Sequence, residues 1–295
     1  MAPHEHPAGG ARMARIGVQL MMLKEQVARS GPYAVLQRVR EAGFRAVEVS
    51  QIPMTAENVA AMRRAREELG VEFGALSAGL GPGANDSLLD DHAKVVADAR
   101  TLGAGLVRIA IMPRPAMASQ EALLHFCRQA EEAAQRLADE GLVLCYHHHH
   151  VELARRGGVT VLDTILAEAP TLRLEVDVHW VQRGGKDPVR TLQAYAGRVD
   201  LVHLKDYRIG ELAPEAFDAD RAGDAAGFQR AFLDVVQFAE VGEGTLDWAA
   251  IVPAALDGGA RYLFVEQDET YGRDPFDSLA LSRDHLRELG FGDLF

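Results

Sequence analysis

The sequence is poor in cysteine, with only two among its 295 residues. Cys127 falls in an amphipathic stretch and Cys145 in an apolar run, so both are expected to behave as small buried hydrophobic residues. Two cysteines in such positions argue against a disulfide framework and against a structural zinc site built from thiolates. They are typical of a reducing compartment, and we expect a cytoplasmic protein.

Long hydrophobic runs and an excess of positive charge are also missing. No window contains 18 consecutive apolar residues, so we expect no membrane span. The net charge is −12, from 31 basic and 43 acidic residues, which is unfavourable for binding a phosphate backbone. Nucleic acid is therefore not an expected partner. Residues 1–14 lack the apolar centre of a secretory signal, and we expect them to be a disordered lead-in.

Short apolar runs instead alternate regularly with amphipathic stretches of helical period from about residue 15 to the end. Eight runs predict strands, at residues 16–20, 46–50, 72–76, 106–112, 142–146, 172–176, 199–202 and 262–265. Eight amphipathic stretches predict helices, at residues 33–42, 55–69, 87–102, 119–140, 159–169, 188–196, 246–257 and 276–289.

Eight strand–helix units in succession predict an α/β protein with a closed parallel sheet, a (β/α)8 TIM barrel that forms a single domain over residues 15–295. A doubly wound open sheet is the alternative, but its glycine fingerprint is missing. The glycine-rich segment 78–85 has another spacing and predicts a loop after the third strand. In the longest connection, 207–244, residues 226–238 predict a short helix or a lid.

The last four predicted strands each end on, or lead straight into, a side chain that can bind a divalent cation. Three of these side chains are Asp177, His203 and Glu266, and the run 142–146 leads into four histidines and Glu152. Neighbouring parallel strands bring their carboxyl ends to one rim, so we expect one shared site there. Nitrogen and oxygen ligands without thiolates suit Mn²⁺, Mg²⁺, Co²⁺ or Zn²⁺.

Asp177 is the strongest single candidate because it ends an uninterrupted apolar strand. The nearest arginine in sequence, Arg173, lies towards the other end of that strand. An unpaired buried carboxylate costs several kcal/mol or becomes protonated, so a cation is the natural partner. Glu175 points to the same face of the strand, and we expect it to form an ion pair inside the barrel.

The ligand from the fifth strand is ambiguous. His147 and His149 lie on one side of an extended chain, and His148 and His150 on the other. We favour Glu152 as the fourth ligand, with His147 and His149 as nearby substrate-binding groups. The histidine run follows a strand directly in mid-chain, so it is interpreted as native rather than as a purification tag.

One lysine and one histidine near these strand ends are candidates for contact with a substrate. Lys205 could bind a substrate hydroxyl or carbonyl; the alternative is an ion pair with Asp206, Glu240 or Glu243. His179, two residues after Asp177, is expected to face inward as a proton shuttle or substrate contact.

Four further side chains have weaker support as substrate-binding groups. Trp180 could form an apolar wall for a sugar ring, or simply pack in the core. Arg183 could meet a phosphate or carboxylate, or be a solvated loop arginine. Gln19 and Glu48, near the ends of the first two strands, are candidate hydroxyl-binding groups.

Five short motifs together resemble the sugar phosphate isomerase/epimerase family, which consists of xylose isomerase-like barrels and includes inosose dehydratase-like members. The resemblance covers residues 15–290 and rests on the segments 146–153, 175–189, 202–206, 241–248 and 264–268. It implies a single metal ion, Mn²⁺ foremost, acting on a hydroxy-carbonyl sugar or polyol. The ligand set that it implies is Glu152, Asp177, His203 and Glu266. His148 and His179 replace the Asn and Tyr that are usual in the family, a departure that concerns the substrate.

We therefore expect a metal-dependent isomerase or epimerase that moves a proton next to a carbonyl group through an enediolate. Glu152 and Glu266 are the expected acid/base pair, and His179 assists. The alternative is a dehydratase or lyase that eliminates from a keto-sugar, keto-inositol or 3-keto-glycoside after the same proton removal. A metal nuclease would need a basic surface, and a non-catalytic binding module would not need four ligand-type side chains. We expect a small sugar or polyol as the substrate, and a homo-oligomer is possible.

Overall fold

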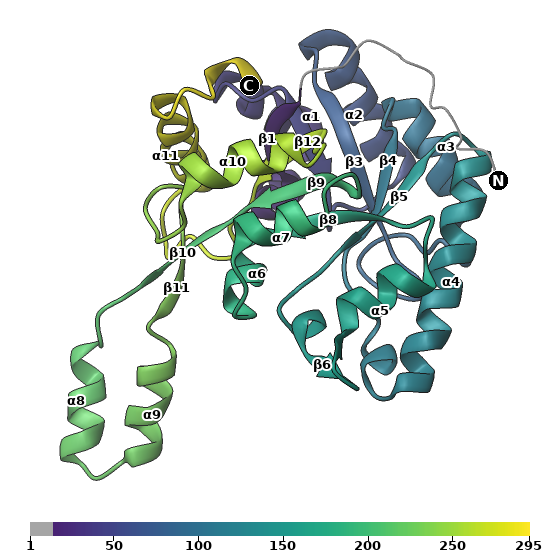
Figure 1. Cartoon of the computed structure of the whole chain (residues 1–295). Coiled ribbons are helices and arrows are strands. Elements are labelled where there is room, and N and C mark those ends of the chain that lie inside the picture. The colour runs from purple at the N-terminus through teal and green to yellow at the C-terminus, as the bar shows by residue number, and fades with distance from the viewer. Residues whose placement is uncertain (1–13) are drawn as a thin grey trace.

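The structure is a computed structural model that describes residues 14–295 (Figure 1). Apart from Ala14, the expected lead-in lies outside the described residues. Eight parallel strands close into a barrel in the order β1-β12-β9-β8-β5-β4-β3-β2, so the predicted TIM barrel is confirmed. No helix in this range is long and apolar enough to cross a bilayer.

Every barrel strand lies within about two residues of a run predicted from apolar periodicity, except that β4 is three residues shorter. The strands are β1 (Arg15–Gln19), β2 (Ala46–Val49), β3 (Glu72–Ala78), β4 (Leu106–Ile109), β5 (Val143–His147), β8 (Arg173–Asp177), β9 (Val199–Leu204) and β12 (Tyr262–Val265). Most of their residues are buried on both faces, which explains why they appear in the sequence as continuous apolar runs.

Eight helices cover the outside of the barrel, close to the predicted positions. They are α1 (Lys24–Glu41), α2 (Ala56–Leu69), α3 (His92–Leu102), α4 (Gln120–Asp139), α5 (Val161–Glu168), α7 (Pro188–Ala194), α10 (Trp248–Asp257) and α11 (Pro275–Glu288). The largest difference is in α1, which begins nine residues before the predicted start. Gly31 interrupts it with a φ of 77° directly before Pro32, and this kink hides the first part of the helix from a periodicity argument.

Short elements connect these units at the carboxyl ends of the strands. Helix α6 (Val178–Arg183) follows β8 directly, and β6 (Arg155–Arg156) pairs with β7 (Val159–Thr160). Four single turns of 3₁₀ helix are η1 (Leu20–Leu23), η2 (Arg114–Met117), η3 (Val151–Leu153) and η4 (Gly292–Leu294).

The interior of the barrel has an apolar layer that lies away from the candidate site. Tyr262 and Phe264 stack with ring centroids 5.6 Å apart, and Cys145 packs in the same cluster. A Cβ atom at Gly74 would lie 2.8 Å from the Phe264 ring, so glycine leaves the space that these two rings fill. Cys127 and Cys145 are buried free thiols, as predicted, and burial raises the pKa of Cys127 to about 11.

The predicted long connection forms an arm, residues 206–239, that projects away from the barrel (Figure 1). Strands β10 (Asp206–Ile209) and β11 (Val236–Ala239) pair antiparallel as its base, and helices α8 (Pro214–Arg221) and α9 (Ala225–Leu233) form its tip. The prediction of a short helix within 226–238 is thus confirmed by α9, whereas the end of that segment is a strand.

Asp206 fixes the neck of the arm to the barrel. Its side chain is fully buried and accepts five hydrogen bonds of 2.7–3.2 Å, which tie the start of β10 to the loop that follows β11. The donors are the backbone N–H groups of Tyr207, Gly242, Thr245 and Leu246 and the indole Nε1–H of Trp248.

We expect Asp206→Ala to lower the free energy of unfolding by about 3 kcal/mol, because it leaves several buried donors without an acceptor. Chemical denaturation followed by circular dichroism measures this change. Asp257→Ala, at an exposed position at the end of α10, is the control and should change stability by less than about 0.5 kcal/mol. Equal stability of the two variants would contradict the role given to Asp206.

Candidate active site

Four buried side chains meet where four neighbouring strands end. One ligand-type atom from each of His147, Asp177, His203 and Glu266 lies within 4.8 Å of the others. The residues come from the ends of β5, β8, β9 and β12, which are adjacent in the barrel. The structure therefore brings together three of the four predicted ligands, Asp177, His203 and Glu266, and adds His147.

The atoms that face one another in this group are the ones left without hydrogen-bond partners. His203 Nδ1 lies 2.8 Å from Glu266 Oε2 and 3.7 Å from Asp177 Oδ2. His147 Nε2 lies 3.5 Å from Asp177 Oδ2. None of these four atoms makes a hydrogen bond of acceptable geometry within residues 14–295. Apart from the Lys205 ammonium 2.8 Å from Glu266 Oε2, these two imidazole nitrogens and two carboxylate oxygens are buried without such a bond, and they are a donor set that fits a divalent cation.

The remaining atoms of both histidines are held so that the free nitrogen points into the group. His147 Nδ1 lies 3.0 Å from the Ala110 carbonyl oxygen, which can only accept, so Nδ1 carries the proton and Nε2 is free to coordinate. His203 Nε2 lies 3.2 Å from Glu48 and 3.1 Å from Glu175, which leaves Nδ1 for the cation. Contacts of this kind orient metal ligands in known sites.

The two carboxylates are held in the same way, each by one oxygen. Asp177 Oδ1 caps α6 by accepting from Trp180 N at 3.1 Å, and Glu266 Oε1 accepts from Gln19 Nε2 at 2.9 Å. Burial alone would raise the pKa of Asp177, but the Lys205 ammonium and the neighbouring histidines hold it well below its ordinary value. Both acids are thus ready to act as anionic ligands.

A second buried group of charges lies beneath the first and supports His203. Arg108 contacts Glu48 at 2.7 Å and Glu175 at 3.1 Å, so a guanidinium rather than a metal neutralises these acids. Burial and the adjacent Glu48 raise the pKa of Glu175 to about 8. The pKa of Glu48 is instead lowered to about 2, because the attraction of Arg108 and His203 outweighs burial. Glu175 thus contacts a cation inside the barrel, as expected, but its raised pKa keeps it largely protonated at pH 7. Glu48 lies in this group, which is a correction to its expected role as a hydroxyl-binding residue.

Glu152, the expected fourth ligand and base, is not brought into the ligand group. The chain turns into η3 after β5, and this turn directs the carboxylate back to the strand that precedes it. Glu152 Oε1 accepts from the Tyr146 hydroxyl at 2.6 Å and Oε2 from the backbone N–H of His149 at 3.0 Å. His147 occupies the position at the fifth strand that the sequence argument gave to Glu152.

Lys205 is surrounded by acids of the site. It does not pair with Asp206, Glu240 or Glu243, the partners considered from the sequence. Its Nζ lies 2.8 Å from Glu266, 3.0 Å from Asp268 and 3.5 Å from Asp177. Asp206 follows Lys205 directly and points to the opposite side of the chain, as successive residues of an extended segment do. These acids outweigh burial and raise the pKa of Lys205, which is therefore a buried cation.

Aromatic side chains form a wall next to Lys205. Its Nζ lies 5.2 Å from the centre of the Trp180 ring and 5.6 Å from that of Phe238, a residue of the arm. His179, in the first turn of α6 rather than on a strand, packs against both rings and is fully buried. Burial lowers the pKa of His179 to about 4, which makes it a neutral imidazole at pH 7.

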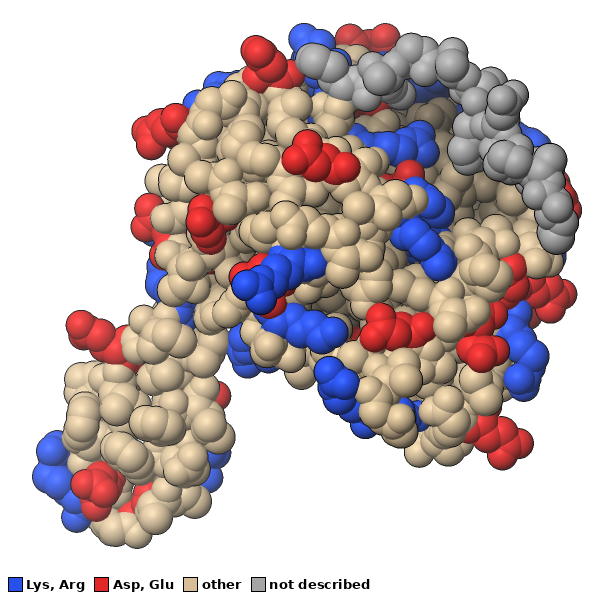
Figure 2. Space-filling model, viewed as in Figure 1, with Lys and Arg blue, Asp and Glu red and all other residues tan. Residues whose placement is uncertain are grey.

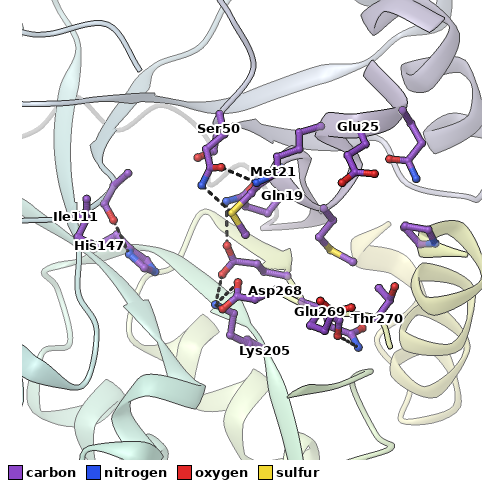
Figure 3. Close-up of a pocket in the computed structure, with 18 of the residues that line it drawn as sticks. Gln19, Met21, Glu25, Ser50, Ile111, His147, Lys205, Asp268, Glu269 and Thr270 are labelled. Carbon is purple, nitrogen blue, oxygen red and sulfur yellow. Dashed lines mark hydrogen bonds and ion pairs between the residues drawn. The ribbon is translucent and has the colours of Figure 1, made fainter. Parts of the chain in front are cut away.

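A cavity of about 690 Å³ opens over the ligand group. Figure 3 shows Lys205 and Asp268 side by side, Gln19 close to them and His147 across from them. His149 also lines this cavity, as predicted for a substrate-binding group. The cavity lining does not include Trp180, Arg183 or Glu48, and Arg183 is an exposed residue of α6.

Asp268 is a charged residue of this cavity that was not predicted from the sequence. It contacts Lys205, and burial raises its pKa to about 6 although the ammonium acts in the opposite direction. Its spacing in the sequence could have indicated this position, because Asp268 comes two residues after Glu266, just past the strand end, within the segment 264–268.

Comparisons with known proteins agree with this fold. Residues 36–289 match the family described as xylose isomerase-like TIM barrel. No curated protein matches the chain at a significant level.

Three solved structures resemble the chain over nearly its full length. A sugar phosphate isomerase/epimerase from Parabacteroides distasonis has a TM-score of 0.69 at 16% identity, covering 98% of this chain and 99% of that one. A probable 3-DHS dehydratase of petrobactin synthesis from Bacillus anthracis has a TM-score of 0.66 at 16% identity, covering 93% and 99%. A xylose isomerase-like TIM barrel protein from Mycobacterium smegmatis, in complex with magnesium, has a TM-score of 0.63 at 16% identity, covering 97% and 100%.

The two possible ligands from the fifth strand can be separated by metal titration. Loss of a residue that only hydrogen-bonds a metal ligand typically weakens metal binding roughly 10- to 100-fold. We expect His147→Ala to weaken Mn²⁺ binding by more than this, because it removes a ligand. We expect Glu152→Gln to weaken it by less than about tenfold. Isothermal titration calorimetry of chelator-treated protein measures both. The reverse order of effects would show that Glu152 is the ligand.

Proposed function

The chain belongs to the xylose isomerase-like TIM barrel family, and on that basis we propose that it is a divalent-metal-dependent isomerase or epimerase of a sugar or keto-sugar derivative. The observation that carries this proposal is the set of four buried, unsatisfied ligand atoms beneath a cavity lined by a lysine and a further carboxylate. Such a site suits a polar substrate that offers oxygen atoms to a cation.

The residues proposed to hold the ion are His147, Asp177, His203 and Glu266. Mn²⁺ is the ion we expect first, and the mixed nitrogen and oxygen donors also suit Mg²⁺, Co²⁺ and Zn²⁺. An ion bound there would polarise a carbonyl oxygen and make the neighbouring C–H group more acidic. The magnesium complex of the Mycobacterium smegmatis protein supports a metal in this kind of barrel.

Lys205 is proposed to bind a substrate oxygen. Its ammonium lines the cavity and is held between Glu266 and Asp268, so its position does not depend on the substrate. A buried cation fixed in this way stabilises negative charge that develops on an oxygen in the transition state.

Asp268 and His149 are proposed to transfer the proton. Both line the cavity, and they follow β12 and β5, which are separated in the barrel by β9 and β8. One group can therefore remove a proton from carbon while the other returns it from a different side, as epimerisation requires. Burial lowers the pKa of His149, so at neutral pH its imidazole can accept a proton.

A dehydratase or lyase is the second candidate, because elimination can follow the same proton removal. The structural similarity to the probable dehydratase from Bacillus anthracis supports it. The two reactions differ in whether the substrate carries a leaving group next to the carbanion, which is a property of the substrate and not of the proton-transfer groups.

We expect solvent deuterium to enter a keto-sugar or keto-inositol when the Mn²⁺-loaded protein is incubated with a substrate panel in D₂O. NMR detects the exchange, and an alkene signal identifies the dehydratase. Exhaustive chelation should abolish both reactions, and undiminished turnover would disprove the metal requirement.

Asp268→Asn tests the proton-transfer role separately. We expect exchange at least about 100-fold slower with Mn²⁺ affinity changed only a few-fold, because general acid–base groups contribute on this order. Asp257→Asn, at the opposite end of the barrel, is the matched control and should exchange at the normal rate. Normal exchange in Asp268→Asn would remove Asp268 from the mechanism.

A further inference from the structure

The tip of the arm carries apolar side chains that no residue of the described range 14–295 covers. Phe217, Phe232 and Leu233 are 45%, 53% and 63% exposed, and α9 has no buried residue. Figure 1 shows α8 and α9 clear of the barrel, and in Figure 2 the arm surface is largely uncharged. Helices of eight and nine residues gain little stability on their own, and α8 and α9 pack on each other through Phe217 and Phe228, which leaves the outer apolar side chains exposed.

The charged residues on the same tip are mainly acidic. Residues 211–234 include six acidic and two basic side chains, a net charge of −4. Both arginines face acids of the tip, Arg221 with Asp218 and Arg230 with Asp224. The remaining acids have no ion pair with any residue of the described chain; they are Glu211, Glu215, Asp220 and Asp234.

A surface of opposite character lies on the barrel beside the site. We call it the basic rim, residues 150–160 and 183–190, which follow β5 and α6. Val151 and Val159 are 41% and 51% exposed there. Figure 2 shows basic side chains on the part of the barrel that faces the arm, over α6, α7 and β6. Five cations of the rim have no ion-pair partner within residues 14–295; they are Arg155, Arg156, Arg183, Lys186 and Arg190.

We propose that two copies of this chain form a two-fold symmetric dimer in which the arm of each copy packs on the basic rim of the other. Apolar side chains ringed by acids then meet apolar side chains ringed by bases, which is both hydrophobically and electrostatically complementary. One arm and one rim per chain make a closed pair, and a closed pair leaves neither surface exposed.

A second copy is the partner favoured by the geometry of a single chain. Asp206 fixes the neck of the arm through five hydrogen bonds, and the arm projects away from its own barrel, so it does not cover the rim of its own copy. The rim adjoins the aromatic wall next to Lys205, because His150 stacks on Trp180 with ring centroids 5.0 Å apart. The arm of the second copy would therefore lie beside the site entrance, whatever reaction occurs there.

The test is the oligomeric state of the full-length chain, measured by light scattering after size exclusion. We expect a dimer at about 100 µM protein, a concentration at which a micromolar association is nearly complete. Phe232→Glu with Leu233→Glu should raise the dissociation constant at least about tenfold, since such anchors carry much of an interface's affinity. Leu281→Glu, on an exposed part of α11, should not.

A charge exchange makes the test specific for the two surfaces. One variant carries Arg155→Glu and Arg190→Glu on the rim, and the other carries Glu215→Arg and Asp220→Arg on the arm. Each alone should be monomeric because its arm and rim then repel each other, whereas an equimolar mixture should form a heterodimer in which both contacts are complementary. Circular dichroism and thermal melting show that each variant folds.

Three results would overturn the proposal. One is a wild-type monomer at the stated concentration, which would leave the arm to a different partner. Another is a dimer that persists in the apolar variant and in both charge variants. The third is a mixture of the two charge variants that stays monomeric.

Discussion

His203 joins the two buried charge clusters of this barrel, and the geometry of the site depends on that single imidazole. One nitrogen faces Asp177 and Glu266, and the other faces Glu48 and Glu175, which Arg108 neutralises. If the inner acids were absent, the ring would lose the contacts that keep Nδ1 turned towards the cation position. The orientation of this proposed metal ligand thus rests on charged contacts located one layer deeper in the barrel.

The two ends of the barrel interior differ in polarity. The apolar layer of Tyr262, Phe264 and Cys145 fills one part of the lumen, while the charged layers occupy the part towards the carboxyl ends of the strands. Because hydrophobic packing supplies stability away from the charged residues, the carboxylates near the cavity can be arranged for chemistry. This division explains why the strands look uniformly apolar in sequence until their last residues.

Periodicity and strand-end reasoning predicted the barrel and placed Asp177, His203 and Glu266 together, because both follow from rules that act along one strand. The same reasoning expected Glu152 in the cluster, whereas after the 3₁₀ turn its carboxylate accepts hydrogen bonds from Tyr146 and His149, and His147 joins the group instead. Lys205 gained its acids from β8 and from beyond β12, contacts that depend on barrel closure rather than on sequence neighbours. The sequence predicted the arm only as a long connection with a short helix or a lid, because β10 and β11 pair across the 26 residues 210–235.

Lys205 has a consequence for how the protein matures. Its ammonium lies within 3.5 Å of Asp177, Glu266 and Asp268, so the newly folded chain already contains an internal counterion for its acids. The barrel can close before any cation is captured, since the repulsion among these carboxylates is relieved from within. A cation bound by these residues would share the acids with the lysine, which stays between Glu266 and Asp268 at the cavity.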